Sequence, residues 1–126
     1  MCDVLILPAL SYRVIGCFYE VHRVLRSGLL ESSYQQALAI ELGASGIPCE
    51  REVPVALQYK GHRIQGFRLD LVVEGKIIIE CKTAESLHPA HMAQLQNYVR
   101  VSRLPLGLLL LFGTKASYQR VTPGST

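Results

Sequence analysis

The spacing of apolar residues predicts two helices near the beginning of the chain. Over residues 11–27 an apolar residue recurs every three or four positions, which is the period of one face of an amphipathic helix. Ser11 is a suitable N-cap for this helix, and the apolar residues before it are expected to form a short arm. A second helix is expected over residues 30–42, and the two glycines that follow closely mark its end.

Alternation with a period of two then predicts an antiparallel pair of strands. Residues 53–59 place an apolar residue at every second position, residues 63–72 do so from Phe67 onward, and a Lys-Gly turn separates the two segments. The second strand is expected to separate its apolar and charged side chains onto two faces, Phe67, Leu69 and Leu71 on one and Arg68 and Asp70 on the other.

The last part of the chain predicts a crossover between buried strands. Residues 76–82 and 106–112 are almost entirely apolar, which is typical of strands buried on both faces. Pro89 suits the first turn of a helix over residues 88–102, and a connection of this length joins parallel strands. With a weaker strand over residues 117–121, the pattern predicts an α/β domain in which helices cover both faces of a mixed sheet.

Composition narrows the class of protein without identifying a function. The 126 residues are 49% hydrophobic and 18% charged, which is expected for a single folded domain over residues 1–126. No apolar run reaches the roughly 18 residues of a membrane span, and the N-terminus lacks the basic region of a signal peptide. The formal charge of +3 permits a nucleic-acid partner without requiring one.

The cysteines favour a reduced, cytoplasmic setting. Their spacing is irregular and includes no C-x-x-C pair, so neither a zinc site nor a disulfide framework is indicated. The four positions are Cys2, Cys17, Cys49 and Cys81.

Four charged residues occupy positions where apolar residues are expected. Glu80 and Lys82 follow three isoleucines and, being two residues apart, point to the same face of their strand. They form either a structural ion pair or a catalytic E-x-K site, and the second is favoured because buried ion pairs rarely stabilise a fold. Asp70 lies in a strand and Glu31 in a first helical turn. The alternative for Asp70 is a salt bridge to Arg68 or to a neighbouring strand, and the alternative for Glu31 is a favourable interaction with the helix dipole.

The turn between Asp70 and Glu80 provides a geometric test. A two-residue loop at Glu74–Gly75 would pair Asp70 with Ile79 and place the two carboxylates on opposite faces. A three-residue loop with Gly75 in the left-handed conformation would pair Asp70 with Ile78 and place the carboxylates on one face. A metal site requires the second loop or a comparable bulge.

These residue types suit hydrolysis of a phosphodiester with a bound divalent cation. Mg²⁺ prefers oxygen ligands, which Asp70 and Glu80 supply, with Glu31 binding directly or through water and the carbonyl of Cys81 as a further ligand. The cation lowers the pKa of its water, and Lys82 orients that water or stabilises charge on the phosphate.

The same residues resemble a known family. Asp70, nine further residues and then Glu80-Cys81-Lys82 resemble the signature of the PD-(D/E)XK nuclease superfamily. Residues 28–34 match the G-x-x-E-x-x-Y motif of one branch, the GxxExxY proteins, and residues 20–23, 68–76 and 94–98 also resemble that branch. Arg26-Ser27 and Cys81 depart from it, where Gly-Pro and an aliphatic residue are usual.

The resemblance spans about residues 11–121 and implies a restriction-endonuclease-like three-layer α/β/α core with a mixed central sheet. It implies nuclease chemistry with Mg²⁺ or Mn²⁺, in which Glu31 is the first-helix acid, Asp70 and Glu80 are metal ligands and Lys82 is the catalytic lysine. Gln94 corresponds to a polar residue that helps to position the site, and Tyr98 follows one turn later.

The remaining polar residues give weaker signals. His22, His88 and His91 are interpreted as packed or surface residues, since nothing in the sequence gives them the geometry of a base. Seven arginines either line a path for nucleic acid or are solvated: Arg13, Arg23, Arg26, Arg63, Arg68, Arg100 and Arg103.

The sequence therefore predicts a metal-dependent nuclease that acts on DNA, with a homodimer or a partner protein helping to hold the duplex. Two alternatives remain open. One is a catalytically inactive nuclease-fold module that binds nucleic acid or a protein partner, and the other is a structural subunit of a larger complex.

Overall fold

A computed structural model describes residues 6–123, and their helices and strands follow one another in the predicted order. The largest difference in boundaries is in the first strand, which begins at Cys49 rather than at residue 53. The elements are α1 (Pro8–Leu25), α2 (Glu31–Ala44), β1 (Cys49–Tyr59), β2 (His62–Val73), β3 (Ile77–Lys82), α3 (Pro89–Ser102), β4 (Leu106–Phe112) and β5 (Ala116–Val121).

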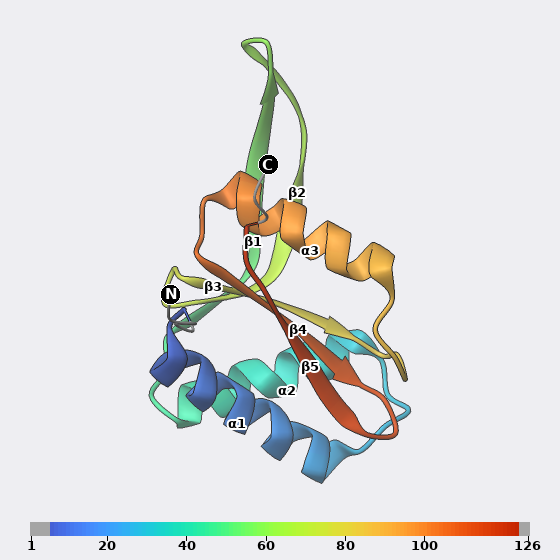
Figure 1. Cartoon of the computed structure of the whole chain (residues 1–126). Helices are drawn as coiled ribbons and strands as arrows, with labels where there is room; N and C mark the ends of the chain where they lie inside the picture. The colour runs from blue at the N-terminus through green and yellow to red at the C-terminus, as the bar shows by residue number, and fades with distance from the viewer. Residues whose placement is uncertain (1–5, 124–126) are drawn as a thin grey trace, which may run out of the picture.

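The strands form a mixed sheet in the order β1-β2-β3-β4-β5. Neighbouring strands are antiparallel except β3 and β4, which are parallel and are connected through α3. Figure 1 shows α1 and α2 on one side of the sheet and α3 on the other. This arrangement confirms the predicted crossover and the three-layer α/β/α core.

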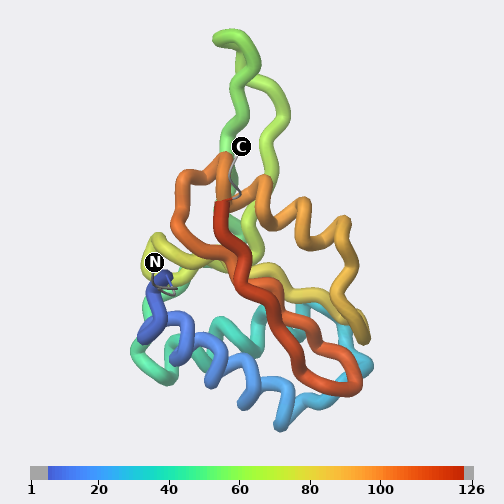
Figure 2. Tube along the Cα trace, viewed as in Figure 1, coloured from blue at the N-terminus to red at the C-terminus, as the bar shows by residue number. Residues whose placement is uncertain are grey.

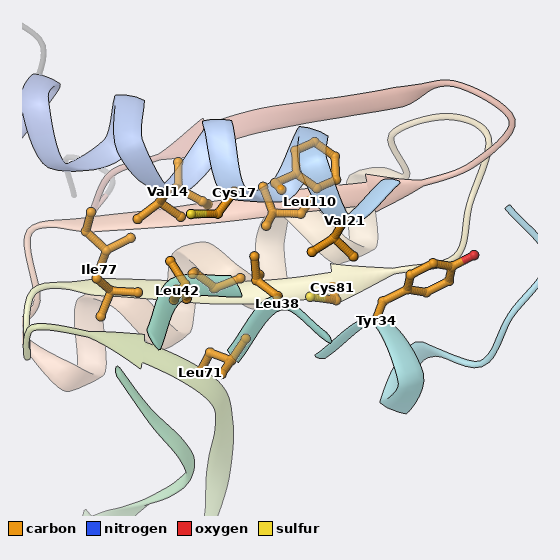
Figure 3. Close-up of a cluster of buried hydrophobic side chains, with 14 of the residues drawn as sticks. Val14, Cys17, Val21, Tyr34, Leu38, Leu42, Leu71, Ile77, Cys81 and Leu110 are labelled. Carbon is orange, nitrogen blue, oxygen red and sulfur yellow. The ribbon is translucent and has the colours of Figure 1, made fainter. Parts of the chain in front are cut away.

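Each face of the sheet has its own apolar core. Tyr34, Leu38 and Leu42 of α2 pack with β3 in the core under α1 and α2 (Figure 3). The other core lies under α3, around Leu95 and Val99. Because β3 and β4 are covered on both faces, nearly all of their residues are apolar, as predicted.

The hairpin formed by β1 and β2 projects beyond the three layers (Figures 1 and 2). Its tip is the predicted Lys60–Gly61 turn, and both residues have positive φ. The register of the hairpin shifts between Val55 and Leu57, opposite Gly66. A Cβ atom on Gly66 would lie 1.8 Å from the carbonyl oxygen of Val55, so this close approach of the two strands requires glycine.

The predicted start of α1 is wrong. The helix begins at Pro8, which suits its first turn because the missing N–H has no partner there. Ser11 is a buried residue inside the helix rather than its N-cap, and its hydroxyl donates a hydrogen bond to the Pro8 carbonyl (3.3 Å). Residues 8–10 of the expected arm are therefore helical, and residues 1–5 lie outside the described residues.

Two further expectations concern cysteines and membrane spans. Cys17, Cys49 and Cys81 are free thiols, and Cys2 lies outside the described residues. Between residues 6 and 123, no helix combines the length and apolar character needed to cross a bilayer.

Candidate active site

The segment between α1 and α2 positions Glu31 as the first residue of α2. Gly28 in this segment has a φ of 100°, a value that favours glycine. Tyr34 is buried one turn into α2, and its hydroxyl donates to the carbonyl of Arg26 and accepts from the N–H of Leu29 (3.2 Å). The glycine and tyrosine of the G-x-x-E-x-x-Y motif therefore fix the segment that leads into Glu31.

Asp70 and Glu80 face each other on β2 and β3. The register pairs Leu71 with Ile79, and its continuation by one residue places Asp70 opposite Glu80. The main-chain N–H of Asp70 points to the carboxylate of Glu80 at 3.5 Å. The two acids are therefore neighbours at the point where the pairing of β2 with β3 ends.

The turn that sets this register has three residues with Gly75 in the left-handed conformation, as the metal site requires, but it lies one residue later than predicted. Residues 74–76 separate the paired residues Val73 and Ile77, and the first two of them have positive φ. The predicted pairing of Asp70 with Ile78 is wrong by two residues. The two carboxylates are nevertheless close together, as the metal site requires.

The side chains of β2 change face at Asp70. Phe67 and Leu69 pack in the core under α3, whereas Leu71 packs in the core under α1 and α2. The prediction that these three share a face is therefore wrong, because regular alternation does not hold through Asp70. By the β1–β2 register Glu52 lies opposite Asp70, and its φ of 56° marks an irregular backbone at the same point.

Gln35 holds Asp70 from α2, a contact that the sequence analysis missed. Its amide Nε2 donates to Oδ2 of Asp70 at 3.0 Å. Gln35 lies four residues after Glu31, so the two residues share one face of α2. That spacing was the available signal in the sequence, and it becomes meaningful only when α2 packs beside β2.

The pKa values of the site reflect buried, crowded acids. Burial, and then the charge of Asp70, raises the pKa of Glu80 to about 7. Burial also raises the pKa of Asp70, while the charge of Lys82 acts in the opposite direction. The charge of Glu31 contributes to the raised pKa of both acids, which indicates that its carboxylate belongs to the same electrostatic environment.

Structural ion pairs do not explain these acids. Within residues 6–123 neither Lys82 nor Arg68 has a carboxylate within 4.0 Å, so the proposed alternatives for Glu80 and Asp70 are not present in this structure. The ion pairs in this part of the chain are Arg23 with Glu20 (2.7 Å) and Lys76 with Glu74 (4.0 Å).

The donor set fits a hard divalent cation. The buried carboxylate of Glu80 and the half-buried carboxylate of Asp70 repel each other, and a cation between them removes this repulsion. Among the described residues, no three or more His, Cys, Asp or Glu side chains lie close enough together to hold an ion. The pair would therefore share an ion with water and main-chain oxygen, which is the usual environment of Mg²⁺.

Cys81 can take part only through its main chain. Its side chain is fully buried in the core under α1 and α2, and burial raises the pKa of its thiol well above the usual range. Its main-chain N–H lowers the pKa of Asp70, so the backbone at Cys81 lies beside the pair.

On α3, Tyr98 lies within the electrostatic environment of the pair. Burial and then the charges of Glu80 and Asp70 raise the pKa of Tyr98, whose ring stacks on Phe67 with centroids 4.1 Å apart. Gln94 is exposed one turn earlier, and no hydrogen bond joins it to the pair within residues 6–123. A positioning role for Gln94 stays a prediction.

The histidines contact other parts of the fold, and within residues 6–123 no arginine forms an ion pair with Asp70 or Glu80. His22 hydrogen-bonds to the carbonyl of Gly113 (2.8 Å), and His88 caps α3 by accepting from the N–H of Ala90 (3.0 Å). The seven arginines are distributed over α1, β2 and α3 and their ends, on both sides of the sheet.

Comparisons with known proteins agree with this geometry. A family model described as the PD-(D/E)XK nuclease superfamily matches residues 8–121. No curated protein matches the chain.

Two solved structures resemble the chain. The crystal structure of SSO0001 has a TM-score of 0.59 and 21% identity, over 76% of this chain and 52% of that one. An alkaline exonuclease (LHK-Exo) from Laribacter hongkongensis has a TM-score of 0.51 and 12% identity, over 68% of this chain and 52% of that one. At these identities the likeness concerns the fold alone. The match covers about half the length of each of the two solved proteins.

Proposed function

Because this chain belongs to the PD-(D/E)XK nuclease superfamily, we propose that it is a divalent-metal-dependent phosphodiester hydrolase acting on DNA. The observation that carries the proposal is the β2–β3 register, which brings Asp70 opposite Glu80. The pair has no ion-pair partner within residues 6–123, so its repulsion favours a cation.

Asp70 and Glu80 are the proposed ligands of Mg²⁺ or Mn²⁺, with Glu31 acting through water and the carbonyl of Cys81 completing the protein ligands. When bound, the cation supplies Lewis acidity and lowers the pKa of a coordinated water. Because Glu80 has a pKa of about 7 without metal, binding must displace a proton at and below neutral pH. Metal affinity should therefore rise with pH through this range.

The other residues orient the reactants. Lys82 projects from the same face of β3 as Glu80, where its ammonium is proposed to orient the attacking water or stabilise charge on the phosphate. Gln35 holds the carboxylate of Asp70 through its hydrogen bond of 3.0 Å. Gln94 and Tyr98 are proposed to position the substrate from α3.

We also propose that the chain belongs to the GxxExxY branch and acts in the cytoplasm. The distinct structural roles of Gly28, Glu31 and Tyr34 support the first of these assignments. A homodimer or a protein partner remains part of the proposal for how a domain of this size holds a duplex.

Calorimetric titration of Mg²⁺ and Mn²⁺, followed by cleavage assays on mixed DNA substrates, tests this function. Metal binding and cleavage should both disappear in Asp70→Asn, and both should survive in Glu50→Gln, which changes an exposed carboxylate of β1. Lys82→Gln should retain the metal and lose roughly 10²–10³-fold in kcat. Absence of metal binding by the wild type would refute the proposed nuclease activity and favour the inactive nuclease-fold module.

A further inference from the structure

The outer part of the β1–β2 hairpin carries an unbalanced positive charge. We call residues 53–69 the basic arm, because they include Lys60, Arg63 and Arg68 and no acidic residue. None of these three cations is ion-paired within residues 6–123. Their charge equals the formal net charge of +3 of the whole chain, so the rest of the chain is neutral in sum.

The basic arm is exposed to an incoming partner. Figures 1 and 2 show that its outer end extends past α3 and lies away from the helices. Tyr59 and Ile64 near the tip are 57% and 47% exposed, although large apolar side chains are usually buried. Arg63 and Arg68 line a hollow of about 580 Å³ on the arm.

The basic arm leads directly to the carboxylate pair. Arg68 and Arg63 precede Asp70 by two and seven residues on β2. At about 3.3 Å per strand residue, they lie about 7 and 23 Å along the strand from Asp70. Phe67 lines the same hollow and stacks on Tyr98, which provides a second connection between the hollow and the site.

We propose that the basic arm binds the phosphate backbone of the DNA whose phosphodiester reaches Asp70 and Glu80. This inference rests on the proposed function. Successive phosphates on one strand of a duplex are 3.4 Å apart along the axis, so the distance to Arg63 corresponds to about seven base pairs. Backbone contacts fix the position of a duplex without reading its sequence, so the arm supplies affinity rather than sequence specificity.

DNA fits the basic arm better than a second copy of this chain. β1 is an edge strand of the sheet and therefore has a free edge that can pair with another strand. Pairing two arms along this edge would bring together two sets of uncompensated like charges, including Lys60 and Arg63 from each copy. A polyanion instead gains from the same charges by releasing its counterions.

Fluorescence anisotropy with a 20-base-pair DNA duplex in EDTA tests the basic arm without depending on cleavage. The test variant is Lys60→Asn/Arg63→Gln, since asparagine tolerates the positive φ of 49° at position 60. The matched control is Lys76→Gln/Lys115→Gln, which removes two exposed positive charges from the β2–β3 and β4–β5 turns. Circular dichroism verifies that both variants are folded.

Loss of two phosphate contacts should make the slope of log K against log [salt] less negative by about 1.8 for the duplex. The ratio of the DNA affinity of the wild type to that of the test variant should then fall about tenfold between 50 and 200 mM salt. The control should keep the wild-type slope. A single-stranded probe should show a smaller change in slope, about 1.4.

Three outcomes would overturn the proposal: wild-type protein that does not bind DNA, equal salt slopes for test and control variants, or a dimer that the arm substitutions convert to a monomer in light scattering. The proposed function fails separately. Arm-dependent binding without metal-dependent cleavage would refute the nuclease and retain the arm, whereas cleavage with arm-independent binding would refute the arm alone.

Discussion

Replacing Glu80 with glutamine should stabilise the metal-free protein at pH 8. Glu80 is only 5% exposed, and burial together with the charge of Asp70 raises its pKa from 4.5 to about 7. The folded state therefore binds the proton more tightly than the unfolded state. The contribution of Glu80 to the free energy of unfolding should be largest below about pH 4.5, fall through the window from 4.5 to 7, and change little above it.

The size of the effect follows from the pKa difference. A rise from 4.5 to about 7, at about 1.4 kcal/mol per unit, corresponds to roughly 3 kcal/mol lost on ionisation of Glu80 in the folded state. Glutamine has nearly the same shape and can still accept the hydrogen bond from the N–H of Asp70, but it carries no charge. The expected gain is therefore roughly 2–3 kcal/mol at pH 8 and close to zero at pH 4.

Urea unfolding in EDTA at four pH values between 4 and 8 measures this difference, with Glu50→Gln as the control for an exposed carboxylate. The stability of Glu80→Gln should vary less with pH than that of the wild type or control. Mg²⁺ should then stabilise the wild type more at pH 8 than at pH 6. Equal stabilities of Glu80→Gln and wild type at pH 8, or parallel pH profiles, would refute the reasoning.

Two further substitutions address the residues that support the site. Gln35→Ala removes the hydrogen bond to the metal-ligand carboxylate and should weaken Mg²⁺ binding about 10–100-fold in calorimetry. The exposed neighbour Gln36→Ala should have no such effect, and equal affinities would contradict the positioning role. Tyr34→Phe keeps the ring stacked on Phe112 (4.2 Å) but loses its hydroxyl bonds, so urea unfolding should show a loss of about 1 kcal/mol. Tyr12→Phe, at a residue that is 79% exposed, should be neutral, and a neutral Tyr34→Phe would show that the hydroxyl does not hold the α1–α2 segment.

The sequence determined the features that depend on neighbouring residues. Periods of three to four and of two residues identified the helices and strands, and the apolar runs that became β3 and β4 indicated strands covered on both faces. The charges of Glu80 and Lys82 were conspicuous in such a run, because a buried strand otherwise contains no charge. These features follow from local periodicity and from the cost of burying charge, so they can be read without knowing how the chain folds.

Tertiary structure decided how those residues meet. The pairing of Asp70 with Glu80 depends on the backbone of a three-residue turn, and the change of face at Asp70 depends on an irregularity shared with Glu52 on another strand. Gln35 reaches Asp70 only because α2 packs beside β2, across a sequence separation of 35 residues. The free energies of turn conformations and of contacts between distant segments leave no periodic signal in the sequence, so the composition of the site could be predicted but its register and its supporting residues could not.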